Sequence, residues 1–194
     1  VILHDDNIID IAIDDPQCGY RHLADKHVYN DGWWNEGSPI YHFYPLNAMT
    51  MTADAVRCRG IDLFDRRFYN MFASPVMGTY PDLFFPAHND GWYGESLVAQ
   101  AELYEFAYAR FGDSLFRDVL AQIYLQSERP AGYALLNPEG IEPAAEPMKL
   151  PGFRFEDMGF ALLRSDAATV VMKYGPHGGG HGHPDKLSIS VHNG

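Results

Sequence analysis

Apolar residues recur at intervals of three and four between residues 95 and 126, which is the spacing of amphipathic helices. In the first segment, Glu95 to Phe111, the apolar positions are Leu97, Ala101, Tyr104, Tyr108 and Phe111. Gly112 suits the end of this helix, and Asp113 or Ser114 suits the N-cap of the next. In the second segment the apolar positions are Leu115, Phe116, Val119, Leu120, Ile123 and Tyr124. The short connection predicts a tight helical hairpin, of the kind that builds bundles, solenoids and toroids.

Another helix is predicted to begin at Pro39. Ser38 is a good N-cap, and proline is favoured at the first helical position. Pro45 removes the hydrogen bond to the carbonyl of Tyr41, so we expect a kink in the first turns. Tyr41 and Tyr44 are then expected on an irregular segment at the mouth of the helix.

Strand-like patterns replace the helical spacing toward the C-terminus. Residues 160–164 and 169–174 are predicted to be two strands joined by a turn, and residues 187–191 to be a third. Four prolines precede these strands and resist regular structure: Pro138, Pro143, Pro147 and Pro151. The pattern predicts an α+β protein with helices over residues 1–137, a proline-rich linker over 138–152 and antiparallel strands over 153–194.

Composition narrows the class of protein. The chain has 194 residues, is 46% hydrophobic and carries a formal net charge of −12, values typical of a globular protein. This acidity argues against nucleic acid or anionic membranes as partners. Cys18 and Cys58 are far apart, which supports neither a disulfide scaffold nor a cysteine zinc site. No stretch reaches the ~20 apolar residues of a membrane span, and the first residues lack the pattern of a signal segment.

A glycine-rich segment, residues 175–188, presents three histidines and a carboxylate just before a predicted strand. His181 and His183 are two residues apart, so their side chains point to one face if the chain is extended. They can bind a metal together, or one can bind a metal while the other faces a substrate. A solvated turn is the alternative interpretation, and the residue types alone leave both open.

Aromatic and polar groups also gather in two other segments. Residues 31–44 fit either a substrate site or an aromatic core with capped helix entrance. Residues 88–93 fit either a sugar cleft, with Trp92 as a stacking platform, or a simple turn. These alternatives also stay open on residue chemistry.

Two motifs, Glu-Gly-Ser-Pro-Ile-Tyr-His at 36–42 and Gly-Gly-His-Gly-His-Pro-Asp-Lys-Leu-Ser at 179–188, resemble those of heparinase II/III-like polysaccharide lyases. The similarity is greatest to the oligo-alginate lyases and spans most of the chain, with both motifs in the family's order. It implies part of an incomplete α/α toroid followed by the start of an antiparallel β-sandwich. Because the chain begins without methionine and its last predicted strand has no partner after it, we expect a piece of a longer protein.

The resemblance implies β-elimination beside a uronic acid, in which a base removes the C5 proton and the 4-O-glycosidic bond breaks. The expected substrate is alginate oligosaccharide, cleaved exolytically, with heparin or heparan sulfate as the alternative. Tyr41, or its competitor Tyr44, matches the catalytic tyrosine, and His181 would face the substrate. An Asn or His pair that neutralises the uronate carboxylate is expected ahead of Val1. The expected substrate-binding residues are Glu36, His42, His88 and Trp92.

No cofactor is expected for catalysis. His183 resembles a residue that ligates a structural zinc in some relatives, with the remaining ligands outside this chain. Asp185 is expected either to belong to a turn or to orient a neighbouring imidazole. The expected partner is an anionic saccharide, and the expected compartment is the cytoplasm or periplasm of a bacterium. Two other function classes are a non-catalytic carbohydrate-binding protein and a hydrolase with two carboxylates, for which Glu36 and Asp90 are candidates.

Overall fold

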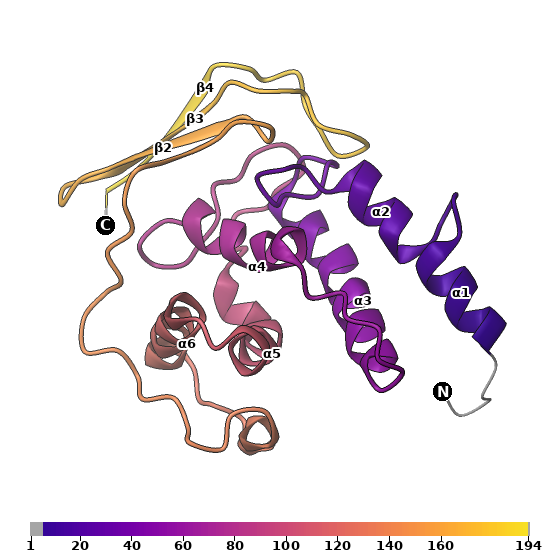
Figure 1. Ribbon diagram of the computed structural model, residues 1–194. Coiled ribbons are helices and arrows are strands. Elements are labelled where there is room, and N and C mark those ends of the chain that lie inside the picture. The colour runs from indigo at the N-terminus through magenta and orange to yellow at the C-terminus, as the bar shows by residue number, and fades with distance from the viewer. Residues whose placement is uncertain (1–5, 194) are drawn as a thin grey trace.

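Helices occupy the first two thirds of the chain and strands follow them, as Figure 1 shows for the computed structural model, which describes residues 6–193. The α-helices are α1 (Asp6–Asp14), α2 (Tyr20–His27), α3 (Pro39–Arg57), α4 (Arg66–Gly78), α5 (Ala101–Phe111) and α6 (Ser114–Gln126). The 3-10 helices are η1 (Leu97–Gln100) and η2 (Ala131–Leu135). The strands are β1 (Phe153–Phe155), β2 (Phe160–Arg164), β3 (Thr169–Lys173) and β4 (Ser188–His192). The predicted fold class, helices followed by antiparallel strands, is confirmed.

The predicted hairpin is formed by α5 and α6. Gly112 ends α5 in the left-handed region, at φ 62°, and its N–H donates to the carbonyl of Tyr108 at 2.9 Å. Asp113 caps α6, because its carboxylate accepts a hydrogen bond from the N–H of Leu115 at 2.9 Å. Local sequence therefore determines both ends of the connection.

The first helix of this hairpin begins later than predicted, at Ala101 rather than Glu95. The backbone just before it bonds to another loop: the N–H of Phe85 donates to Glu95 O at 2.8 Å, and the N–H of Leu97 donates to Leu83 O at 3.0 Å. These bonds keep residues 95 and 96 outside the helix, and the 3-10 helix η1 then leads into α5.

Helix α3 runs unbroken from Pro39 to Arg57, so the irregular segment expected around Tyr41 and Tyr44 is wrong. Proline has a helical φ, and at position 45 it removes only the one bond to the Tyr41 carbonyl while the bonds on either side continue the helix. The two tyrosines therefore sit one turn apart on a regular helix, with ring centroids 6.1 Å apart.

Aromatic rings form the core between α4, α5 and α6. Phe72, Tyr104 and Phe116 are fully buried, and their ring centroids are 6.1 to 6.4 Å apart. The hydroxyl of Tyr104 donates to the carbonyl of Phe72 at 2.9 Å, so its polar atom is satisfied inside the core. Much of the chain's aromatic content thus serves packing.

The described strands form one antiparallel sheet in the order β1-β2-β3-β4. Phe160, Leu162 and Val171 are buried on the face that packs against the helices. The residues that alternate with the inward-facing ones point to the other face, and most are apolar: Ala161, Leu163, Val170, Met172, Ile189 and Val191. Because the strands are numbered along the chain, the order β1-β2-β3-β4 also means that each strand pairs with its neighbours in the sequence.

Reciprocal hydrogen bonds attach this sheet to the helical part. The carboxylate of Asp31 accepts from the N–H groups of Asp157 and Met158, both at 2.9 Å. In return, the carboxylate of Asp157 accepts from the N–H of Asn30 at 3.0 Å. The sheet is thus held against the turn that follows α2, which is the turn that leads into α3.

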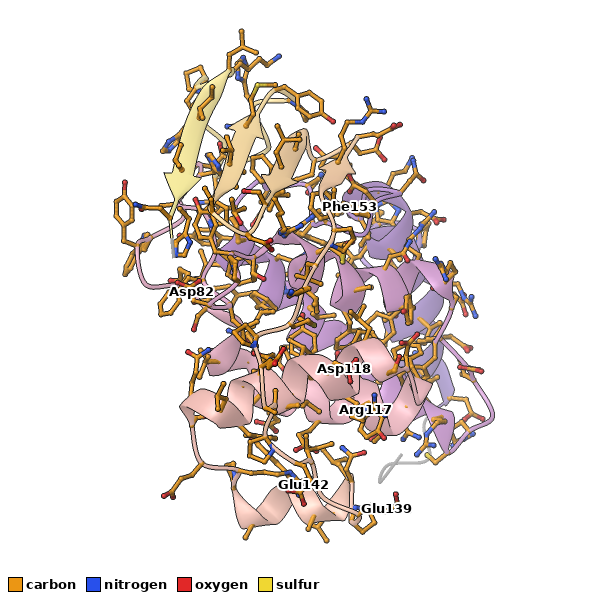
Figure 2. All side chains as sticks on the ribbon, turned by 90° about the vertical axis from the view of Figure 1, so that its left-hand side faces the viewer. Asp82, Arg117, Asp118, Glu139, Glu142 and Phe153 are labelled. Carbon is orange, nitrogen blue, oxygen red and sulfur yellow. The ribbon has the colours of Figure 1, made fainter. Side chains whose placement is uncertain are left out.

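Residues 136–152 contain no helix or strand and run along α6, where the N–H of Ala144 donates to Ala121 O at 2.9 Å. Figure 2 shows Glu139 and Glu142 at the end of the molecule away from the sheet, and Phe153 where the chain enters it. The domain boundaries at 137 and 152 stay predictions. Within residues 6–193, no helix has the length and apolar content needed to span a membrane.

Candidate active site

The glycine-rich loop between β3 and β4 packs backbone to backbone against the turn before α3 (Figure 1). The N–H of Gly179 donates to the carbonyl of Asn35 at 2.8 Å. A Cβ added at Gly178 would lie 3.0 Å from the Cα of Gly37, and one added at Gly182 only 1.6 Å from the carbonyl oxygen of His177. Gly178 is therefore needed for this close approach, which brings the histidines to α3, and Gly182 for the tight fold of the loop itself.

Tyr41 and His181 meet at this contact, although about 140 positions separate them in the chain. Their rings stack with centroids 3.4 Å apart and an interplanar angle of 6°. Tyr41 is half-buried, whereas Tyr44, one turn further along α3, has 69% of its surface exposed. The structure thus brings together the two residues singled out from the separate motifs, and Tyr41 is the tyrosine in contact with the histidine.

Asp90 lies between His181 and His183 of the loop. One carboxylate oxygen is 2.9 Å from His181 Nδ1, and the other is 2.5 Å from His183 Nε2. Hydrogen bonds from His181 and then from His183 hold the pKa of Asp90 below its usual range. Because an ionised carboxylate only accepts hydrogen bonds, His181 must donate through Nδ1, which leaves its Nε2 to exchange a proton with a ligand.

The role expected of Asp185 belongs instead to Asp90. Asp185 forms an ion pair with Lys173, and its backbone carbonyl accepts from the N–H of Ser188 at 3.2 Å. The carboxylate of Asp185 is thus hydrogen-bonded to an ammonium rather than to the expected imidazole, although it interacts electrostatically with the ring of His88. Its expected place in a turn agrees with the structure.

His42 is fully buried, which corrects its prediction as a substrate-binding residue. The N–H of Trp34 donates to His42 Nδ1 at 3.1 Å, and His42 Nε2 is 2.8 Å from the carbonyl oxygen of Met71. Burial lowers the pKa of His42 to about 4, so the ring is neutral at pH 7. Both ring nitrogens are hydrogen-bonded to backbone groups, so neither is available to a substrate.

The other expected substrate-binding residues differ in exposure. His88 is buried, with its ring stacked 5.0 Å from that of Phe160, and burial lowers its pKa to about 4. It lies between sheet and helices, so its expected place in an open cleft is also corrected. Trp92 is 68% exposed and Glu36 is half-buried beside the glycine-rich loop. These two remain accessible to a ligand, and their binding roles stay predictions.

The donor set around His183 does not by itself make a zinc site. Within residues 6–193, no three or more His, Cys, Asp or Glu side chains gather so that they could hold a metal ion. His183 Nε2 is also bonded to Asp90, which occupies the nitrogen. The zinc role of His183 stays a prediction, and no chemical step below depends on a metal.

Sequence reasoning missed the connection between Asp90 and the histidines. The Asn89-Asp90-Gly91 stretch has the composition of a turn, and Asn89 does adopt a left-handed backbone with φ 55°. Nothing in local spacing relates Asp90 to a loop 91 positions away. The only signal was the neighbouring His88 and Trp92, which marked the segment as a candidate cleft without identifying its partner.

Replacement of Asp90 by Asn is expected to lower turnover by ~10–100-fold, the usual effect of losing a residue that orients a functional imidazole. The amide keeps the shape but offers only one accepting oxygen, so it cannot accept from both histidines. Turnover of the full-length variant, measured on the substrate found for the parent protein, checks this.

Asp82 provides a matched control for that variant. Its carboxylate is 2.9 Å from His192 Nε2, and the ring of His192 stacks on Tyr80 with centroids 4.6 Å apart. In Figure 2 Asp82 lies beside the end of the sheet. Asp82→Asn therefore perturbs a similar Asp–His pair and is expected to leave turnover unchanged. Equal losses in both variants would contradict the role given to Asp90.

Residues 147–193 match the family described as heparinase II/III-like, C-terminal. This segment contains the four strands and the loop with His181 and His183. No protein with a curated description matches the chain.

Several solved structures share the fold, and three of them illustrate the similarity. They are a heparan sulfate lyase HepC mutant from Pedobacter heparinus (TM-score 0.61, 19% identity), a heparinase III that is the BT4657 gene product (0.63, 22%) and a further heparinase III (0.65, 15%). They align with 90%, 95% and 90% of this chain, which spans 26%, 26% and 28% of their lengths. The chain therefore has the fold of about a quarter of a heparinase III, and its residues 147–193 have the pattern of the heparinase II/III-like C-terminal family.

Proposed function

We propose that this chain carries part of the active site of a polysaccharide lyase, which cleaves the 4-O-glycosidic bond beside a uronic acid by β-elimination. The stacking of Tyr41 on His181 carries the proposal, because it joins a phenol hydroxyl and an imidazole from two distant motifs at one accessible place. Both groups can exchange protons, which the elimination requires twice.

The proposed reaction moves one proton from carbon and one to oxygen. A base takes the C5 proton, the electron pair forms the C4=C5 double bond, and the C4–O4 bond breaks. An acid protonates the departing O4, so the products are an unsaturated uronate and a free hydroxyl. A free tyrosine has a pKa of ~10, so a phenolate base needs nearby donors, whereas a neutral Tyr41 is well suited to protonate O4.

His181 has the complementary role in this proposal. Since Asp90 accepts from Nδ1, the ring is held in the tautomer that presents Nε2 toward a ligand. When Nε2 takes the proton, the ring stays hydrogen-bonded to the Asp90 carboxylate through Nδ1. The pair supplies a base and an acid that act on one sugar residue.

Within this class we propose alginate oligosaccharide as the substrate, cleaved exolytically. Sulfated chains favour sites rich in free basic groups. Of the four arginines at positions 57, 59, 66 and 67, three form ion pairs with aspartates, and the first of these pairs is Arg57 with Asp54. Arg59 pairs with Asp6, and Arg67 pairs with Asp25. Heparan sulfate is the second candidate, because a structural neighbour is named as a heparan sulfate lyase.

Ultraviolet absorbance of the unsaturated product tests the proposal directly. The full-length protein is mixed with alginate, with heparan sulfate and with an uncharged glycan, and absorbance is followed with time. A rise with alginate alone is expected, and the sizes of the first products distinguish release from chain ends from internal cleavage. A rise with heparan sulfate alone would move the substrate to the second candidate, and no rise with either uronate polymer would exclude the lyase.

A further inference from the structure

Lys173, the last residue of β3, is fully buried beneath the glycine-rich loop, which we also call the histidine loop because it carries His181 and His183. Its ammonium donates to three oxygens: the side-chain oxygen of Asn89, the carbonyl of His183 at 2.9 Å and the carboxylate of Asp185. A lysine has three N–H donors, so all of them are used.

Such a buried charge is costly unless it is paired and fully hydrogen-bonded. Burial is the largest single influence on Asp185 and disfavours its charge, but the hydrogen bond from Lys173, the positive charge of Lys173 and smaller contributions together leave the pKa of Asp185 below its usual value. An apolar side chain here would avoid the cost of burying an ammonium. A lysine at this point therefore suggests a task other than stability.

Asn89 links Lys173 to the candidate active site through hydrogen bonds. Its side-chain oxygen accepts from Lys173 and also from the N–H of His183 at 3.0 Å, while its side-chain N–H donates to the carbonyl of Gly37. The next residue is Asp90, which is hydrogen-bonded to His181 and His183. Lys173 thus connects the strand, the 89–90 turn and the loop at the point where Asp90 meets the histidines.

We propose that Lys173 is a positioning residue, which holds the backbone of the histidine loop and of the Asp90 turn so that His181 stays stacked on Tyr41. The expected loss of turnover rests on the proposed function, whereas the expected effect on the structure of the loop does not. Lys173 has no exposed surface, so it touches no substrate and acts through Asn89 and the main chain of His183.

Lys173→Met in the full-length protein tests this, because methionine keeps an unbranched stem and removes the ammonium. Deuterium uptake of residues 176–187 is expected to rise while uptake in α5 and α6 stays unchanged. Misplaced catalytic groups are expected to lower kcat by ~10–100-fold with KM changed less than about threefold. Lys149→Met, at an exposed linker position, is the matched control and should match the parent in both measurements.

Unchanged uptake in the loop, or a raised uptake with parental kcat, would overturn the proposal. If Lys173→Met does not fold, Asp185→Ala decides, because that carboxylate is 38% exposed and only one of three contacts is lost. It should show the same changes to a smaller extent, and parental values in both measurements would overturn the positioning role. Raised loop uptake in a protein that cleaves no uronate polymer would support the structural role and reject only the lyase.

Discussion

Tyr41→Phe is expected to lower turnover by ~10²–10⁴-fold, the usual effect of losing a positioned acid or base. The substitution removes one oxygen and leaves the ring, so the 3.4 Å stack on His181 can be kept. Folding should hardly change for the same reason. Measurement of kcat and of the melting temperature in the full-length protein separates these two effects.

Tyr44→Phe is the matched control, because Tyr44 lies one turn away on the same helix and is largely exposed. It should keep parental turnover. If Tyr44→Phe loses activity while Tyr41→Phe retains it, the catalytic role moves three residues along the chain. If Tyr41→Phe instead keeps turnover and loses roughly 0.5–1.5 kcal/mol of stability, Tyr41 is a packing residue with a satisfied hydroxyl.

Stability is expected to fall on acidification because of His42. Its pKa is about 4 in the folded protein against an ordinary value of 6.5, so below pH 6.5 the unfolded chain binds a proton that the folded chain does not. The contribution is complete above pH 6.5 and is lost progressively as the pH falls toward 4. Between pH 7.5 and pH 5 the loss amounts to about 2 kcal/mol from His42. His88, whose pKa is also about 4, adds a loss of the same sign.

Urea unfolding at pH 7.5 and pH 5 measures this loss, and His42→Gln identifies its origin. Glutamine can still accept from Trp34 and donate to Met71, but it does not titrate. The variant should lose less stability than the parent between the two pH values. His22→Gln, on the half-exposed face of α2, should lose as much as the parent. A parental pH dependence in His42→Gln would show that the buried imidazole is not responsible.

Elements set by local sequence could be predicted well. The α5–α6 hairpin follows from helical spacing together with Gly112 and Asp113, and the strands follow from alternation. Pro45 misled the prediction, because the loss of one hydrogen bond was given more weight than the continuity of the helix around it. The start of α5 was missed because residues 95–97 bond to residues 83–85, a contact that no local pattern records.

The site was predictable where side chains follow a helical face. The buried face of α3 includes Phe43, Leu46, Met49 and Ala53, and His42 lies on it, whereas Tyr41 and Tyr44 point elsewhere. That spacing already distinguishes a core histidine from an accessible tyrosine, and it could have corrected the prediction for His42. Asp90 and Lys173 could not be found this way, because their roles arise only when distant segments dock.

The distance along the chain between Tyr41 and His181 also has a consequence for folding kinetics. Forming contacts between remote segments costs a large loop-closure entropy, so these contacts form after the local helices and hairpins. A chain whose helices have formed but whose sheet has not docked therefore contains no Tyr41–His181 pair. Under the proposed function, the two groups that exchange protons with the sugar therefore come together only when the sheet docks.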